Sequence, residues 1–174
     1  PADAVETKWA VREAAAIDGP VYLRLNRNDL PVLFDENTSF ETGKPITLRE
    51  GSDIALIGTG TMSAIALEAA GLLENRGISA RVIHMGTIKP LDREALAGAV
   101  KGVKGIVTCE EHTIYGGFGS AVAEALCAAP LPMRMVGIQD RYGQSAVYYQ
   151  ELLECYGLTK EAVSGAAKIL LESL

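Results

Sequence analysis

The sequence has few of the features that mark secreted, membrane-spanning or nucleic-acid-binding proteins. Its three cysteines, Cys109, Cys127 and Cys155, are odd in number and far apart, which suggests neither a disulfide framework nor a zinc site. No apolar run approaches the roughly 20 residues of a membrane span, and no signal-peptide pattern is present. The net charge of −6 argues against nucleic acid as the main partner. These features favour a protein of the reducing cytoplasm.

Apolar residues make up 48% of the 174 residues, which is enough for one buried core. The chain opens at Pro1, without a methionine, and runs directly into a helical pattern. We therefore expect a piece of a longer polypeptide.

The first 45 residues read as an appended tail. A helical pattern over 3–17 stops at Gly19-Pro20, and a short strand is predicted over 21–25. A linker without clear periodicity follows, up to residue 45. One helix and one strand are too little to fold alone.

From residue 46 to 174, strands and helices alternate. The predicted strands are 53–57, 80–85, 105–109 and 134–138, and the predicted helices are 61–75, 90–100, 118–129, 147–155 and 159–171. Short, continuous apolar strands that alternate with helices are typical of an α/β fold. We predict a three-layer domain, with a mainly parallel sheet and helices on both faces.

The turn at 58–63, Gly-Thr-Gly-Thr-Met-Ser, loosely matches a dinucleotide-binding pattern. Such a site needs an acidic residue at the end of the next strand, where the sequence has His84 and Met85. A tight strand-to-helix turn is the better interpretation, and His84 is most simply a residue at a strand end.

A second glycine-rich helix start follows the residues Glu110, Glu111 and His112. Gly117, Gly119 and Ser120 open this helix, and backbone N–H groups at such a point can hold an anion. Paired carboxylates with a histidine can also act in acid–base chemistry, but no nucleophile lies beside them. Structural packing or a subunit contact is the favoured interpretation of the three residues.

Arg27 is the strongest candidate for ligand binding. It follows the predicted strand in a polar turn between Asn26 and Asn28, where a guanidinium group can hold a phosphate through two hydrogen bonds. A solvated arginine is the alternative. We predict no catalytic residue and no metal ligand in this chain.

Several stretches together resemble the transketolase family over essentially the whole chain. Residues 19–31 are similar to the end of the pyrimidine-binding domain, and 53–60 are similar to the start of the C-terminal domain. Further matches occur, in the family's order, at 88–92, 110–112, 116–120 and 156–159. The resemblance is closest to the C-terminal subunit of split bacterial and archaeal transketolases. It divides the chain into a tail of the pyrimidine-binding domain plus linker (1–45) and a C-terminal domain (46–174).

The resemblance implies a transferase that moves a two-carbon ketol unit between sugar phosphates, using thiamine diphosphate and magnesium. The family's Gly-Asp-Gly motif for the cofactor is absent here, and its activating glutamate lies upstream of Pro1. We therefore expect no cofactor bound to this chain, no activity without an N-terminal subunit or domain, and a homodimer of the assembled enzyme. By resemblance, Arg27 matches the arginine that holds the substrate phosphate. The pair Tyr148-Tyr149 is a candidate dimer contact.

Three alternatives stay open. The Tyr-Pro-Arg-Gly-Asn stretch of 1-deoxyxylulose-5-phosphate synthases is absent, and the β subunits of 2-oxoacid dehydrogenases need no phosphate arginine. A non-enzymatic assembly or regulatory domain that binds an anion at 117–120 is the third. The family's Ser-Gly pair after the last strand is replaced by Gly143-Gln144-Ser145-Ala146.

Overall fold

The most apolar strands form the centre of a five-stranded sheet in the computed structural model, which describes all 174 residues. The strands are β1 (Ile46–Arg49), β2 (Ile54–Gly58), β3 (Ala80–His84), β4 (Ile106–Thr113) and β5 (Met133–Ile138), in the spatial order β1-β3-β2-β4-β5. All neighbouring pairs are parallel except β1 with β3. The predicted α/β fold with a mainly parallel sheet is therefore confirmed.

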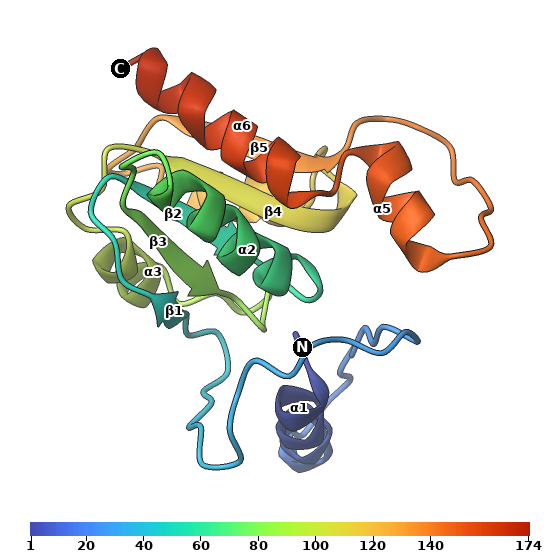
Figure 1. Cartoon of the computed structure of the whole chain (residues 1–174). Helices are drawn as coiled ribbons and strands as arrows, with labels where there is room; N and C mark the ends of the chain where they lie inside the picture. Colours follow the sequence, from blue (N-terminus) through green and yellow to red (C-terminus); the bar gives the residue numbers. More distant parts are fainter.

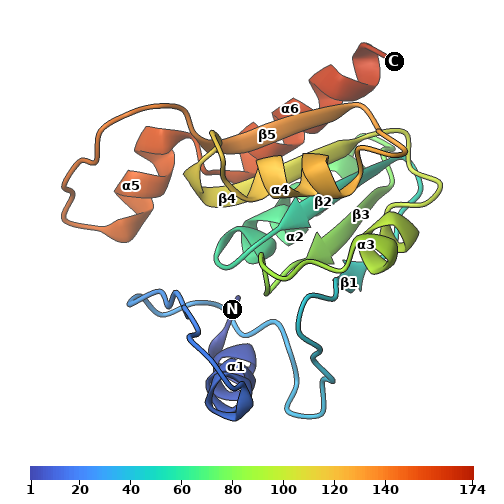
Figure 2. The same ribbon diagram turned by 180° about the vertical axis from the view of Figure 1, so that it is seen from behind.

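Helices cover both faces of this sheet. Along β2, Ile54 and Leu56 pack with α2 (Met62–Glu74) and α6 (Lys160–Glu172), whereas Ala55 and Ile57 pack with α3 (Arg93–Ala99) and α4 (Phe118–Ala125). Figure 1 shows α2 and α6 on one face, and Figure 2 shows α3 and α4 on the other. Since both faces are buried, the central strands carry apolar residues without alternation.

Two boundaries differ from the predicted ones. The helix expected from Pro90 begins at Arg93, because the Asp92 carboxylate caps it by accepting a hydrogen bond from the Ala95 N–H. Strand β4 runs on to Thr113, so Glu110 lies inside the strand rather than after it. The remaining short helix, α5, spans Tyr149–Tyr156.

The strand predicted over 21–25 is wrong. This segment is not paired with any strand, and residues 18–32 form no backbone–backbone hydrogen bond. It has the residue pattern of a strand, but a strand also requires a pairing edge, and none lies beside it. Tyr22 is consequently 89% exposed.

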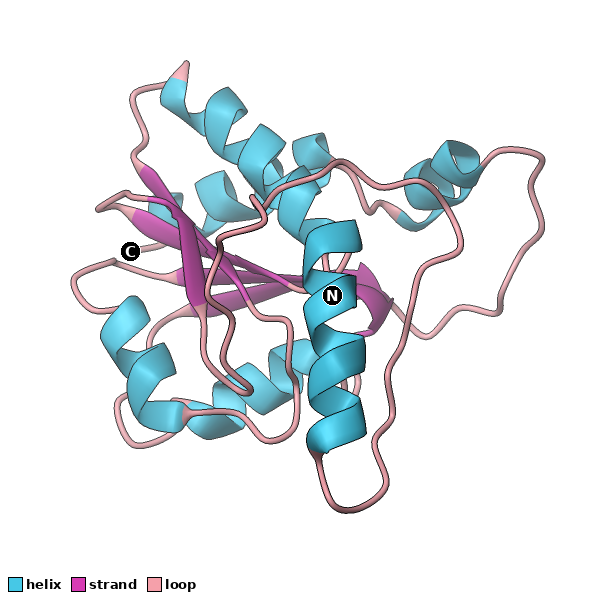
Figure 3. Cartoon of the chain, turned by 90° about the horizontal axis from the view of Figure 1, so that it is seen from below, coloured by secondary structure: helices cyan, strands magenta, loops and turns pink.

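The N-terminal residues form a small aromatic core, which packs on the rest of the chain where Phe34 lies 5.4 Å from the His84 ring and where Ile46 and Leu48 contact the cluster. Helix α1 (Ala4–Ala16) carries Trp9, whose ring lies 5.5 Å from that of Phe40, and Phe34 lies 5.0 Å from Phe40. Figure 1 shows α1 below the sheet, and Figure 3 shows it from that side. No helix has both the length and the apolar character needed to cross a membrane.

We predict opposite effects for alanine at two glycines, one at the end of β2 and one inside α2. A Cβ atom on Gly58 would lie 2.8 Å from the Ser63 Cα, so Gly58→Ala should lower the free energy of unfolding by about 1–3 kcal/mol. Gly71 lies inside α2 with open space around it, so Gly71→Ala should raise it by up to about 1 kcal/mol. Urea denaturation measures both changes, and equal effects would contradict the packing described for these two glycines.

Candidate functional site

Four polar side chains meet at the edge of the sheet where β2 and β4 end. Asn26 donates from Nδ2 to Thr61 Oγ1 (3.0 Å) and to the Tyr149 hydroxyl (3.1 Å), and that hydroxyl donates to the Glu111 carboxylate (2.7 Å). We call these four residues the Asn26 cluster. They come from the extended segment after α1, the start of α2, β4 and the start of α5. This edge of a parallel sheet is where ligands usually bind.

Arg27 lies at the tip of a turn that the Asn26 cluster holds in place. The Asn26 Oδ1 atom accepts hydrogen bonds from the backbone N–H (2.8 Å) and the side-chain amide (2.9 Å) of Asn28. Arg27 itself is exposed and forms no hydrogen bond or ion pair with the chain. Its guanidinium group is therefore free to bind an anion.

Tyr149 is neutral at physiological pH. Burial, together with the hydrogen bond and the negative charge of Glu111, raises the pKa of Tyr149 to about 12 against the lowering effect of Thr61 and Asn26. The hydroxyl consequently stays protonated and donates a hydrogen bond to the Glu111 carboxylate.

At the anion site predicted for Gly117, Gly119 and Ser120, the chain itself supplies a carboxylate that binds the Gly119 N–H. Glu110 is 1% exposed, and its carboxylate accepts hydrogen bonds from the N–H groups of Phe118 (2.6 Å) and Gly119 (2.8 Å). The Ser120 hydroxyl donates to the Ile114 carbonyl (3.2 Å). Because these N–H groups are committed to Glu110, we do not place an external anion at this helix start.

The turn at 58–63 is likewise satisfied from within. The N–H groups of Met62 and Ser63 donate to the carbonyl groups of Thr59 (3.2 Å) and Gly60 (3.1 Å). This agrees with the interpretation as a tight turn. All three cysteines are free, as expected, and burial raises the pKa of the Cys109 thiol. No group of three or more His, Cys, Asp or Glu side chains is placed to hold a metal ion.

His84 belongs to a buried hydrogen-bond chain. Its Nε2 atom lies 2.9 Å from Glu6 Oε1, and its Nδ1 atom lies 2.7 Å from Ser63 Oγ. The connectivity is that of a hydrolytic triad, but His84 and Ser63 are fully buried and Glu6 is 3% exposed. No substrate can reach the serine, so these three hydrogen-bonded side chains have a structural role: they join α1 to the sheet and to α2.

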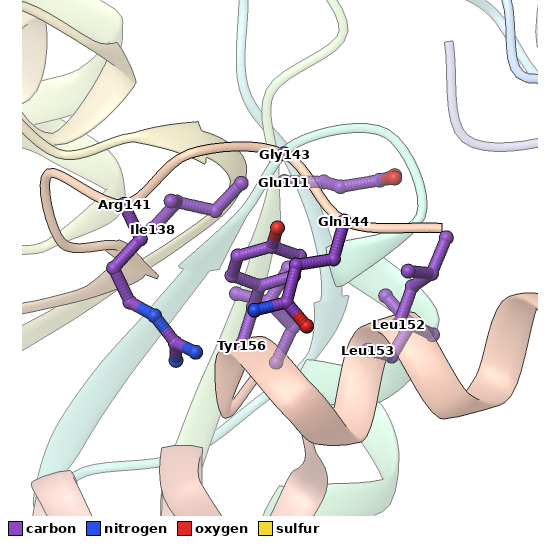
Figure 4. A pocket seen from close by; sticks show the side chains of 9 residues that line it. Glu111, Ile138, Arg141, Gly143, Gln144, Leu152, Leu153 and Tyr156 are labelled. Atoms are coloured by element: carbon purple, nitrogen blue, oxygen red, sulfur yellow. The ribbon is translucent and has the colours of Figure 1, made fainter. Parts of the chain in front are cut away.

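Two cavities flank the Asn26 cluster. The smaller, of about 170 Å³, is shown in Figure 4, where Arg141 and Tyr156 lie near each other and Glu111 contributes to the wall. The Arg141 guanidinium carbon lies 5.2 Å from the centre of the Tyr156 ring. The larger cavity, of about 530 Å³, is lined by Thr61 and Tyr149, among other residues from segment 29–31, α2, α5 and α6.

Arg27 stays a prediction, and the sequence did not indicate the side chains that hold its turn. Tyr148 and Tyr149 stay candidate dimer contacts; Tyr149 is half-buried and bound within the Asn26 cluster, while Tyr148 is 69% exposed. Asn26 and Tyr149 are 123 positions apart, so no local pattern connects them. The only local signal was the Asn26–Asn28 spacing, which is typical of an asparagine turn.

We predict that Glu6 is needed for stability. The buried Glu6 carboxylate is hydrogen-bonded to His84 Nε2 and to the Ala2 N–H. Leaving a buried polar group without its partner costs about 1–3 kcal/mol for each group, so Glu6→Ala should lower the free energy of unfolding by about 2–6 kcal/mol. Glu124 is an exposed glutamate in α4, and Glu124→Ala should change it by less than about 0.5 kcal/mol. Similar losses in the two variants would contradict a special role for Glu6.

The same pair predicts a pH dependence. Burial raises the pKa of Glu6, but the hydrogen bond and charge of His84, with the Ala2 N–H, outweigh it, and the pKa lies below the ordinary value of 4.5. A lowered pKa means that the stabilisation is present above pH 4.5 and is lost as the pH falls through the folded-state value. The wild-type protein should therefore lose more stability on acidification below that pH than Glu6→Gln does, as measured by denaturation at a series of pH values.

Comparison with known proteins places these features in a family. Residues 43–163 match the family model of the transketolase C-terminal domain. The chain is 39% identical to the 6-deoxy-6-sulfo-D-fructose transketolase subunit SqwH of a Clostridium species, over 99% of this chain and 53% of that protein. It is 42% identical to a 1-deoxy-D-xylulose-5-phosphate synthase of Symbiobacterium thermophilum, over 98% of this chain and 27% of that protein.

A solved structure gives the same result for the fold. A split-gene transketolase, described as an inactive tetramer of beta subunits, superposes with a TM-score of 0.94 at 46% identity, over 99% of this chain and 56% of that one. The chain spans about half the length of the curated transketolase subunits it matches. On this evidence, the chain belongs to the transketolase C-terminal domain family.

Proposed function

We propose that this chain is the C-terminal part of a thiamine-diphosphate-dependent transketolase, which transfers a two-carbon ketol unit between sugar phosphates in the cytoplasm. The observation that carries the proposal is the exposed, unpaired Arg27 at the tip of a fixed turn, in a chain of this family. A phosphate group has the charge and the geometry that a free guanidinium group binds best.

Residues 1–45 form the tail of the pyrimidine-binding domain and a linker in this proposal, and residues 46–174 form the C-terminal domain. The unpaired segment 21–25 supports the division. Its backbone N–H and C=O groups form no backbone hydrogen bonds within the chain, which suits a strand that pairs with another part of the assembled enzyme.

An N-terminal subunit or domain supplies the site for thiamine diphosphate and magnesium. The glycine-rich helix start of this chain does not fit the diphosphate, because the buried Glu110 carboxylate already binds the N–H groups of Phe118 and Gly119 there. The isolated chain is then inactive and binds no cofactor. The assembled enzyme is a homodimer, and the exposed side chains of Tyr142, Val147 and Tyr148 offer an apolar contact for it.

Activity should therefore require the partner. With thiamine diphosphate, magnesium, xylulose 5-phosphate and ribose 5-phosphate, the chain alone should give no turnover, and adding the N-terminal subunit should restore it. Turnover by the chain alone would contradict the proposal. Turnover of the complex only with pyruvate as donor would instead indicate a 1-deoxyxylulose-5-phosphate synthase.

In the assembled enzyme, Arg27→Ala should raise the KM for phosphorylated sugars and spare kcat. Loss of a charged partner costs about 2–5 kcal/mol when buried and less when solvated, so kcat/KM should fall by roughly 10- to 1000-fold. The kcat/KM of Arg27→Lys should lie between those of the wild type and Arg27→Ala, because lysine keeps the charge but cannot form two parallel hydrogen bonds to one phosphate. Arg12→Ala, which removes an exposed arginine of α1, should leave the kinetics unchanged.

Ribose in place of ribose 5-phosphate provides the internal comparison. Its kcat/KM should be much less affected by Arg27→Ala. Equal losses on the two sugars would assign Arg27 to the fold or to the dimer and would remove the phosphate contact from the proposal.

A further inference from the structure

The turn that carries Arg27 has very few attachments to the rest of the molecule. Residues 18–32 form no backbone–backbone hydrogen bond, so side chains alone hold this segment. Only two of its side chains form hydrogen bonds to the domain that begins at residue 46. Arg24 donates to the Glu111 carbonyl (3.1 Å), and Asn26 donates to Thr61 and Tyr149.

Both attachments meet at Glu111. Arg24 donates to the main-chain oxygen of Glu111. The Tyr149 hydroxyl, which accepts from Asn26, donates to the Glu111 carboxylate (2.7 Å). Glu111 of β4 therefore takes part in both attachments, and the Asn26–Thr61 hydrogen bond adds a direct link to the start of α2.

The Asn26 amide uses all of its hydrogen-bonding capacity. Its two N–H bonds go outward, to Thr61 and Tyr149, and its oxygen goes inward, to both nitrogens of Asn28. The same side chain thus shapes the turn around Arg27 and fastens it to α2 and α5. A displacement of the Tyr149 hydroxyl would therefore move the turn that carries Arg27, because the Asn26 amide is bonded to both.

We propose that Tyr149, together with Thr61 and Glu111, positions Arg27 for the substrate phosphate and so contributes to selectivity for phosphorylated sugars. This inference rests on the proposed function. It assigns the C-terminal domain a role in substrate recognition through a positioning residue that does not touch the substrate. Because the pKa of Tyr149 is about 12, its hydroxyl keeps this contact throughout the neutral range.

The test compares two tyrosines of α5 in the enzyme assembled with its N-terminal subunit. Tyr149→Phe removes the hydroxyl that joins Asn26 to Glu111. Tyr156→Phe removes a hydroxyl that donates to the Tyr142 carbonyl (2.7 Å) and has no hydrogen bond to the Asn26 cluster. The measured quantity is the kcat/KM for ribose 5-phosphate divided by that for ribose.

Tyr149→Phe should lower this ratio about 2- to 10-fold, the size expected for one or two neutral hydrogen bonds, through a higher KM for ribose 5-phosphate with kcat spared. Tyr156→Phe should leave the ratio unchanged. Thr61→Val, which removes an acceptor of the same amide, should reproduce the effect of Tyr149→Phe and serves if that variant assembles poorly.

A double mutant determines whether Tyr149 acts through Arg27. In the Arg27→Ala background, Tyr149→Phe should cause no further fall in the ratio, because the positioned group is gone. A further fall of the same size as in the wild type would overturn the inference, since Tyr149 would then act elsewhere. Equal losses on both sugars in Tyr149→Phe alone would also overturn it and would leave only a structural role.

These outcomes are distinct from failure of the proposed function. If Arg27→Ala lowers the ratio but Tyr149→Phe does not, the phosphate contact stands and the positioning role falls. If Arg27→Ala itself leaves the ratio unchanged, the phosphate contact of the proposed function is wrong, and the positioning role is wrong with it.

Discussion

The buried hydrogen bond between Glu6 and His84 is the contact on which the arrangement of the N-terminal residues depends. His84 ends β3 and Glu6 lies in the first turn of α1, so the pair joins a helix near the start of the chain to the carboxyl end of β3. Two buried polar groups stabilise a fold only when their remaining hydrogen-bonding atoms are also satisfied. Here Ser63 takes the second ring nitrogen of His84, and the Ala2 N–H takes the second oxygen of Glu6. Three separate parts of the chain are thus fixed by one buried pair.

The same turn of α1 also holds the far end of the extended segment. Asp3 caps α1 through the Glu6 N–H (2.8 Å), and its other oxygen accepts from the N–H groups of Leu33 (2.7 Å) and Phe34 (2.9 Å). Arg27 therefore lies between two anchors, the Asn26 cluster on one side and Asp3 on the other. Both anchors lead back to the sheet, the first through Glu111 and the second through α1 and His84. A segment without secondary structure is in this way held between two fixed points.

Sequence patterns predicted the parts of the fold that depend on local rules. Continuous apolar runs located β2, β3 and β4 because both faces of the sheet are covered. The short edge strand β1 was missed, since it has four residues and pairs antiparallel with a strand more than thirty positions away. The strand prediction for 21–25 was wrong for the opposite reason, because the segment has the residue pattern of a strand but no sheet edge of this chain lies beside it. In the candidate site, Arg27 was visible from its polar turn, whereas the Asn26 cluster joins residues 35 to 123 positions apart.

Glycine-rich helix starts show why such patterns do not by themselves predict a ligand. The N-terminus of α4 attracts a negative charge whatever its source, and in this fold the source is Glu110, eight residues upstream in β4. The glycines are needed for packing around that carboxylate: a Cβ atom on Gly117 would overlap it, and one on Gly119 would lie 2.7 Å from Thr108 Oγ1. A bound phosphate and a buried glutamate both require small residues at the same positions of a helix start. Only the tertiary contact distinguishes a ligand site from a structural helix start. Here the contact of Glu110 with α4 is structural. It fixes the end of β4, which carries Glu111, and Glu111 in turn holds the turn of Arg27.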